Sequence, residues 1–322
     1  MPLTLFILAR PYSEDHLVRL PHRRLAAALA MGAAVSLAAS ACGSSSLGGS
    51  AGGPSNSVTP TGSVDQALVA KLPAKVKTAG KIVVGVDATY APNEFLGPDG
   101  KTVEGMDVDL FNAVAQTFGV KVEWQPAPFD SIILGVNSGK YDIGISSFSV
   151  TSEREQKATM VSYFTAGTQW ATAKSNPKNI DPNNACGHNI AVQKATTQAD
   201  DIAAKSKKCV NSGKKKINIG IYADQGQATA SVVSGKNDAM LADSPVGAYA
   251  VKQTGGKLQA IGAIYDSAPY GYVLPKAETD VGQAIVDALK KLQTSGAYKQ
   301  ALEKWGVSAG AITDFAVNPS VS

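Results

Sequence analysis

Hydrophobic residues follow two alternating spacings over the first half of the chain. Short apolar runs rich in β-branched residues are separated by stretches in which apolar residues recur every three or four positions. The expected elements, in chain order, are a short helical region at 66–79 interrupted by Pro73, strand 81–86, helix 106–118 ended by Gly119, strand 120–124, helix 129–136 and strand 142–146. This β-α-β-α-β order predicts a parallel sheet with right-handed crossovers.

A second series of the same kind follows. Its expected elements are an extended segment at 169–173, strand 189–192, a helix after Thr197 to about 206, strand 217–222, helix 225–234, strand 239–242, helix 244–253, strand 258–261, a return segment at 270–274, and helices 280–292 and 297–304. Two α/β units joined by two extended segments predict two lobes, one formed by 67–168 and 270–316 and the other by 169–269. The carboxyl ends of the strands would face the cleft between the lobes, where open α/β folds bind ligands.

The segment 141–156, YDIGISSFSVTSEREQ, carries candidate binding chemistry. A short strand opens into a loop with the hydroxyl residues Ser146, Ser147, Ser149 and Thr151, and a helix start follows. Ser152 and Glu155 have the spacing of a capping box, with Thr151 as the alternative N-cap. Arg154 lies in the first turn, where the helix dipole disfavours a cation. Such a loop suits a bound carboxylate, although a solvated loop with a surface arginine is the alternative.

The N-terminal region has the features of an export signal. Arg23 and Arg24 precede an apolar run, and small residues precede Cys42. This predicts a lipoprotein signal peptide over 1–42 with Cys42 as the lipidated residue; plain secretion is the alternative. Residues 43–66 are rich in Gly, Ser and Pro and predict a flexible tether.

Charge and cysteine content narrow the function classes further. Four of the 30 basic and two of the 26 acidic residues precede Cys42, so the remainder has a formal charge of only +2, which argues against nucleic-acid binding. Cys186 and Cys209 are the two remaining cysteines and predict a disulfide in an oxidising compartment, with two free thiols as the alternative. His188 is the only histidine beyond the signal, and no ligand cluster accompanies it, so neither a metal nor a cofactor is expected.

Five motifs, in the same order, resemble family 3 of the bacterial extracellular solute-binding proteins, the polar amino-acid receptors of ABC importers. The resemblance covers about residues 68–310. The motifs are the loop from Thr89 to Phe95, the signature Gly105-Met106-Asp107-Val108-Asp109-Leu110, the ligand loop from Ser146 to Arg154, the loop from Gln193 to Gln198 and the closing helix from Ser295 to Gly306. Two residues depart from the family pattern, namely Met106 and Ala195, which stands where the family usually has glycine.

The resemblance implies an α/β fold of the type II periplasmic-binding-protein class, with a hinge between the lobes. It implies that Arg154 binds the α-carboxylate of an amino acid, helped by backbone N–H groups at Ser149 and Thr197. The ammonium group would bind Asp243 and Ser147. From the residues alone, Asp243 is also a candidate N-cap for the following helix.

Further site residues follow from the same resemblance. Tyr90 would stack over the ligand side chain, Phe129 would form a second wall, and Asp87 would face the polar end of that side chain. Ser146 and Thr196 belong to the two ligand loops, whereas Asp107 and Asp109 would orient a loop and a helix start. Asp87 favours a cationic or amide side chain (arginine, lysine, histidine or glutamine), and an acidic ligand stays open.

The expected function is therefore capture of a polar amino acid by hinge closure. The protein would be a lipid-anchored monomer on the extracellular face of the cell membrane, delivering its ligand to an ABC permease. A dehydratase-like enzyme of the same fold, with Asp87 or Glu94 as general acid, and a ligand-binding subunit of a sensor are the alternatives. Lysines at 207–208 and 214–216 form either a docking face or a solvated loop.

Overall fold

The computed structural model describes residues 64–321. The predicted signal peptide, Cys42 and nearly all of the predicted tether lie outside these residues. The helices are α1 Gln66–Ala70, α2 Ala74–Ala79, α3 Met106–Thr117, α4 Phe129–Asn137, α5 Ser152–Lys157, α6 Thr197–Asn211, α7 Gln225–Val233, α8 Ser244–Gln253, α9 Thr279–Ser295, α10 Ala297–Trp305 and the 3₁₀ helix η1 Ser308–Gly310. The strands are β1 Lys81–Val86, β2 Thr89–Tyr90, β3 Glu94–Leu96, β4 Val103–Glu104, β5 Lys121–Pro126, β6 Ile143–Gly144, β7 Thr159–Ala173, β8 Asn189–Gln193, β9 Asn218–Tyr222, β10 Ala239–Asp243 and β11 Leu258–Leu274.

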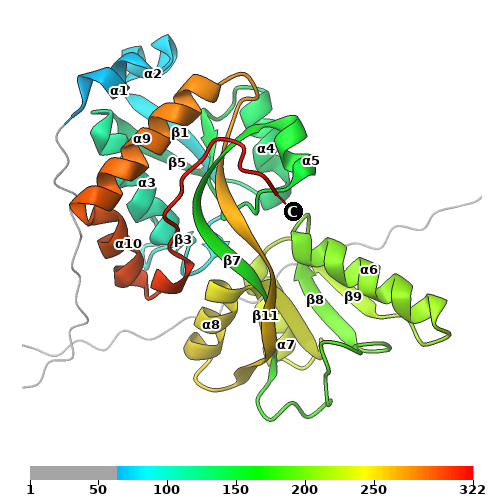
Figure 1. The fold of residues 1–322 in the computed structure, drawn as a ribbon. Coiled ribbons are helices and arrows are strands. Elements are labelled where there is room, and N and C mark those ends of the chain that lie inside the picture. The colour runs from blue at the N-terminus through cyan, green and yellow to red at the C-terminus, as the bar shows by residue number, and fades with distance from the viewer. Residues whose placement is uncertain (1–63, 322) are drawn as a thin grey trace, which may run out of the picture. The chain divides into compact units, whose positions relative to one another are not determined.

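One eight-stranded sheet runs through the described residues in the order β5-β1-β6-β11-β7-β10-β8-β9. At one end β1 pairs in parallel with both β5 and β6, and at the other end β8 pairs in parallel with β9 and β10. Both predicted β-α-β-α-β series are therefore confirmed, and each forms a lobe with the same strand order. Figure 1 shows the two lobes with β7 and β11 passing between them.

The two connections between the lobes are longer strands than the sequence predicted. The extended segment at 169–173 is the end of the fifteen-residue strand β7, and the segments at 258–261 and 270–274 are the two ends of the single strand β11. These strands pair antiparallel, with register shifts between Ile261 and Gly271. The irregular pairing lies where the chain passes from one lobe to the other.

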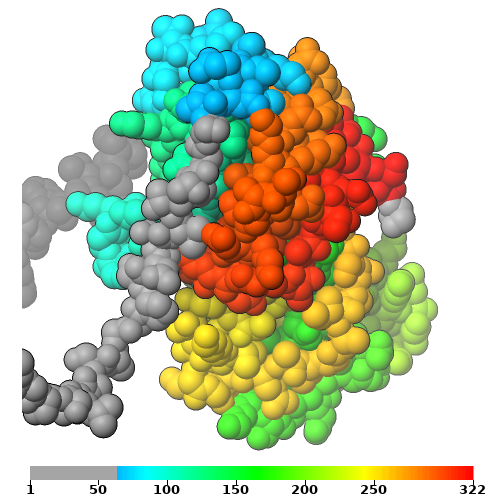
Figure 2. All heavy atoms as spheres, turned by 60° about the vertical axis from the view of Figure 1, so that its left-hand side comes forward, coloured from blue at the N-terminus to red at the C-terminus, as the bar shows by residue number. Residues whose placement is uncertain are grey.

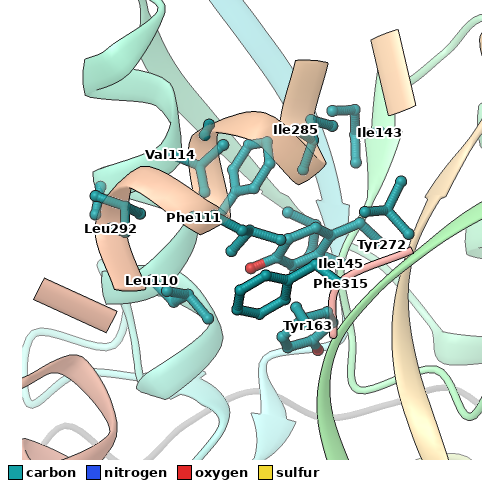
Figure 3. Packing of buried hydrophobic residues seen from close by; sticks show 14 of the residues in the cluster. Leu110, Phe111, Val114, Ile143, Ile145, Tyr163, Tyr272, Ile285, Leu292 and Phe315 are labelled. Atoms are coloured by element: carbon teal, nitrogen blue, oxygen red, sulfur yellow. The ribbon is translucent and has the colours of Figure 1, made fainter. Parts of the chain in front are cut away.

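Aromatic side chains from β7 and β11 form the centre of the first lobe's core. Tyr163 and Tyr272 stack with ring centroids 4.0 Å apart, and Phe111 of α3 packs edge-on against Tyr272. Figure 3 shows these rings among aliphatic residues of α3, β6 and α9. The apolar stripe predicted for the 106–118 helix is thus the face that α3 buries, and Phe111 and Leu110 are fully buried.

Helices α9 and α10 cover one face of the first lobe (Figure 2). The residues after η1 return along β7, where Val317 forms an isolated bridge with Val161. Asn318 completes this contact, because its backbone N–H donates to the Met160 carbonyl and its side chain accepts from the Met160 N–H. The C-terminal segment therefore extends the first lobe beyond the predicted closing helix.

The second lobe has its own core around Trp170, with Ile190 and Leu241 from neighbouring strands. Cys186 and Cys209 form a disulfide between the loop before β8 and the end of α6, which confirms the predicted pairing. The lysines of the adjacent loop, 214–216, are exposed. That exposure fits the solvated-loop interpretation.

Candidate functional site

All ten residues predicted to bind a ligand line one cavity, which is narrow and leaves only about 10 Å³ of free space. The lining residues are Asp87, Tyr90, Phe129, Ser146, Ser147, Ser149, Arg154, Thr196, Thr197 and Asp243, together with Gln193 and Gln198, which were not predicted as binding residues.

The polar residues of the cavity stand at the carboxyl ends of strands from both lobes. Asp87 follows β1, Ser146 and Ser147 follow β6, Gln193 ends β8 and Asp243 ends β10. In each lobe these strands are parallel neighbours, so their ends meet at one edge of the sheet. The topology alone therefore brings together groups that are up to 156 positions apart.

Arg154 lies beside a stacked pair of aromatic rings, Phe129 and Phe148, at the edge of the cavity. Its guanidinium carbon is 5.5 Å from the centre of the Phe129 ring and 5.4 Å from that of Phe148, within cation–π range. Nη1 donates to the Ser149 carbonyl at 2.8 Å, and Nη2 donates to the Ala195 carbonyl of the other lobe at 3.1 Å. These contacts fix the orientation of the guanidinium in the cavity lining.

The N-cap of α5 is Thr151, whose hydroxyl accepts from the Arg154 N–H at 3.2 Å. Of the two caps left open by the sequence, the structure therefore selects Thr151. Ser152 becomes the first residue of the helix. The cap places Arg154 in the first turn, at the N-terminal end of the helix, where a bound carboxylate is also favoured by the helix dipole.

Asp243 occupies the N-cap position of α8 but makes no side-chain cap. Instead its buried carboxylate accepts from the Tyr90 hydroxyl at 3.0 Å and from Gln198 Nε2 at 2.8 Å. Burial raises the pKa of Asp243, while these donors act in the opposite direction. The side chain is thus directed at the cavity.

Asp87, another residue of the cavity lining, is also buried. Its carboxylate accepts from the Thr89 hydroxyl at 2.8 Å and from Gln193 Nε2 of the second lobe at 2.5 Å. Burial raises its pKa above the usual value for an aspartate. The carboxylate has no cationic partner among the described residues.

Asp107 and Asp109 lie outside the cavity lining, as the resemblance implied. Asp107 accepts from the Ser147 N–H at 3.1 Å and so holds the ligand loop, whereas Asp109 accepts from Trp305 Nε1 at 2.7 Å and pairs with Lys304. Both therefore orient neighbouring elements.

Several contacts cross from one lobe to the other around the cavity. Besides the Tyr90–Asp243, Asp87–Gln193 and Arg154–Ala195 hydrogen bonds, Asp130 of α4 pairs with Lys194 at 2.7 Å. The lobes are consequently in contact at the site, which is the closed arrangement of a hinged binding fold.

A sequence model of the bacterial extracellular solute-binding proteins, family 3, matches residues 82–308. The chain belongs to this family. The matched range includes every residue of the cavity lining. The family consists of binding proteins, so the chain is an extracellular solute-binding protein rather than an enzyme.

One relative and two solved structures show how similar the chain is to individual amino-acid-binding proteins. The arginine-binding protein ArgT of Corynebacterium glutamicum is 32% identical over 252 residues, covering 78% of this chain and 82% of the relative. A solved ancestral arginine-binding protein bound to arginine has a TM-score of 0.65 and 29% identity, covering 70% of this chain and 98% of that one. An ancestral amino acid-binding protein described as a precursor of cyclohexadienyl dehydratase also has a TM-score of 0.65, with 30% identity, covering 72% of this chain and 97% of that one.

These similarities confirm the predicted fold class, the two-lobe periplasmic binding protein of type II. In the described range 64–321, no group of three or more His, Cys, Asp or Glu side chains has the arrangement of a metal site. No described helix combines the length and apolar character needed to cross a membrane.

Ala195, at the family's usual glycine position, has a left-handed backbone with φ of +61° and is exposed. Because this conformation costs a non-glycine residue about 1–2 kcal/mol, Ala195→Gly should stabilise the fold by up to about 1 kcal/mol after the entropy cost of glycine. Chemical denaturation would measure the gain. The matched control, Ala230→Gly in α7, should destabilise by about 1 kcal/mol, and a loss of stability in both variants would contradict the expected relief of strain.

Proposed function

We propose that this protein captures a basic L-amino acid, with arginine as the first candidate, by closing its two lobes over the ligand. The observation that supports this proposal is the arrangement of charged groups in the cavity. Arg154 and the carboxylates of Asp87 and Asp243 line it together, and none of the three forms an ion pair with another described residue. A buried charge without an ionic partner is costly, so the site favours a ligand that supplies the missing charges.

Arginine carries the complementary set of charges. Its α-carboxylate would form a bidentate pair with Arg154, and its α-ammonium group would bind Asp243 with help from the Ser147 hydroxyl. Tyr90 and Phe129 would hold the aliphatic part of the ligand. Asp87 would accept from the guanidinium at the far end.

The arginine-binding relatives support this assignment. Their ligand has one anionic and two cationic groups, as the cavity requires if its three charges are to be neutralised. Neutral amino acids would leave Asp87 buried without a cation.

Closure would bend the two long connecting strands. The register shifts of β7 and β11 lie between the lobes, near the predicted boundaries at 168–169 and 269–270, and irregular pairing makes this the easiest place to bend. Ligand would bind one lobe first, and contacts such as Asp87–Gln193 and Lys194–Asp130 would then favour the closed state. The closed protein, anchored through Cys42 at the extracellular face of the membrane, would dock on an ABC permease.

A thermal-shift screen of residues 43–322 tests the ligand class. The panel is the twenty amino acids with ornithine, citrulline and several cyclic acids. A ligand at a hundredfold excess over its Kd stabilises the native state by about 2.7 kcal/mol, so arginine should raise the Tm clearly. A shift with acidic amino acids alone would overturn the proposed ligand class, and consumption of a cyclic acid would overturn the binding function.

Asp87→Asn tests the side-chain end of the site. The substitution removes the charge that faces the ligand guanidinium, so affinity for arginine should fall about 10- to 100-fold. Affinity for citrulline, which has nearly the same shape but no side-chain charge, should change little. Isothermal titration with both ligands measures the two effects, and an equal fall for both would show that Asp87 does not select for charge.

A further inference from the structure

Two carboxyl groups lie directly beneath the ligand loop without lining the cavity. Glu94 is in β3 and Asp107 is in the first turn of α3, and both residues are 0% exposed. The backbone before β3 packs against Gly105, the residue that precedes α3, and a Cβ at Gly105 would lie 2.1 Å from the Asn93 carbonyl oxygen. The backbone packing therefore fixes the two carboxyl groups next to each other.

Both carboxyl groups bind the Ser146–Ser147 turn. Glu94 accepts from the Ser146 hydroxyl at 3.1 Å and faces the Ser147 hydroxyl at 3.2 Å. Asp107 Oδ2 accepts from the Ser147 N–H at 3.1 Å and from the Tyr163 hydroxyl at 2.7 Å. These bonds hold Ser147 in a left-handed backbone with φ of +51°, and the turn forms part of the cavity lining.

One oxygen of this network lacks a donor. Asp107 Oδ1 is fully buried, and no described N–H or O–H group donates to it. Its other oxygen, Oδ2, and Glu94 Oε2 both lie against the Ser147 hydroxyl, at 3.3 and 3.2 Å. Because Ser147 has a single hydroxyl proton, two ionised carboxylates would repel each other there, whereas one proton held by the pair removes that repulsion.

We propose that Glu94 and Asp107 share one proton and that this shared proton holds the Ser146–Ser147 turn in its ligand-binding conformation. Glu94 is then a positioning residue, which acts on the ligand through the two serines. The inference rests on the proposed function, because it concerns affinity at the same site.

The charged surroundings support a single shared proton. Of the groups around the pair, Asp87 at the end of β1 is another carboxylate, while Tyr90, Tyr163 and Tyr272 are neutral phenols from β2, β7 and β11. No lysine, arginine or histidine of the described chain forms an ion pair with either carboxyl group. A second negative charge would thus have no compensation.

The pKa values have the corresponding directions. Burial, followed by repulsion from Asp107, raises the pKa of Glu94 well above its usual value, and burial raises the pKa of Asp107 to about 6. Above pH 6 the pair therefore keeps one proton until the higher pKa is reached. Because the folded state retains this proton and the unfolded state does not, stability is lost as the pH rises through that higher pKa.

The proton itself can be observed without ligand. In protein labelled with ¹³C at the glutamate side-chain carboxyl, one resonance should titrate far above the others, and it should disappear in Glu94→Gln. The surface control Glu303→Gln, on α10, should leave it in place. Glutamate resonances that all titrate in the ordinary acidic range would overturn the shared proton, whether or not the protein binds arginine.

Binding supplies the second test. Glutamine at position 94 can donate to Asp107 and accept from a serine, so Glu94→Gln should stay within about threefold of wild-type affinity for arginine at pH 7, whereas Glu94→Ala should lose about 10- to 100-fold. The wild type should also lose affinity at alkaline pH more steeply than Glu94→Gln. Deprotonation of the ligand ammonium weakens both proteins equally, so the difference isolates the shared proton.

The outcomes separate the two proposals. A wild-type protein that binds no basic amino acid contradicts the proposed function, and the carboxyl resonance still decides the shared proton. A protein that binds arginine, but with identical pH profiles for wild type and Glu94→Gln, overturns the positioning role alone. A folded Glu94→Gln variant that binds arginine as weakly as Glu94→Ala would also overturn the positioning role, because it would show that the ionised carboxylate is required.

Discussion

Replacing Arg154 with alanine is expected to lower the affinity for L-arginine by roughly a thousandfold, or about 4 kcal/mol. The substitution removes a bidentate pair with the α-carboxylate in a cavity that excludes most water. It also removes the Arg154–Ala195 hydrogen bond, which joins the lobes in the closed state. Isothermal titration with L-arginine measures the loss.

Two controls separate the lost pair from a damaged fold. Alanine is a good helix former and keeps the backbone N–H that donates to Thr151, so the free variant should unfold near the wild-type temperature. Arg154→Lys keeps the charge but not the planar fork and should recover only part of the affinity. Agmatine, which is arginine without its carboxylate, should bind the wild type and Arg154→Ala with the same low affinity. Unchanged arginine affinity in Arg154→Ala would rule out this placement of the carboxylate.

The sheet of each lobe could be predicted because its signals are local. An apolar run such as 81–86 and a helical stripe such as that of 106–118 are read from neighbouring residues, and Gly119 marks a helix end. Parallel pairing then follows from the β-α-β order alone. None of these steps needs a contact between distant parts of the chain.

The connecting strands depend on distant contacts, and their length was missed for that reason. Along β11, residues 262–269 are exposed or half-buried without regular alternation, so the sequence shows no strand pattern between the two predicted ends. Their pairing with β7 is set by the lobes on either side. The small sheet β2-β3-β4 was also missed, because its strands have only two or three residues each.

The site residues divide in the same way. The hydroxyl loop and Arg154 are recognisable because they follow a strand and begin a helix. Gln193 and Gln198 were missed because neutral amides have no distinct sequence signal, and their partners Asp87 and Asp243 lie far away in the chain. The available signal was their position, because Gln193 ends β8 and Gln198 lies in the first turn of α6.

Asp243→Asn is expected to reduce the affinity for L-arginine by about 100-fold, or close to 3 kcal/mol. The amide has the shape of the carboxylate and can still accept from the Tyr90 hydroxyl, and Gln198 can turn its own amide to match. The variant therefore loses the charge and keeps the packing. What disappears is the charge-assisted bond to the α-ammonium group.

Desamino-arginine, in which hydrogen replaces the α-ammonium group, makes this prediction specific. Wild type and Asp243→Asn should bind it with similar affinity, because neither can form the missing bond, whereas L-arginine should separate them by about 100-fold. Titration of both proteins with both ligands gives the coupling energy between Asp243 and the ammonium group. An equal loss for the two ligands would mean that Asp243 acts through Tyr90 and the closed lobes, and the ammonium group would then have to bind elsewhere.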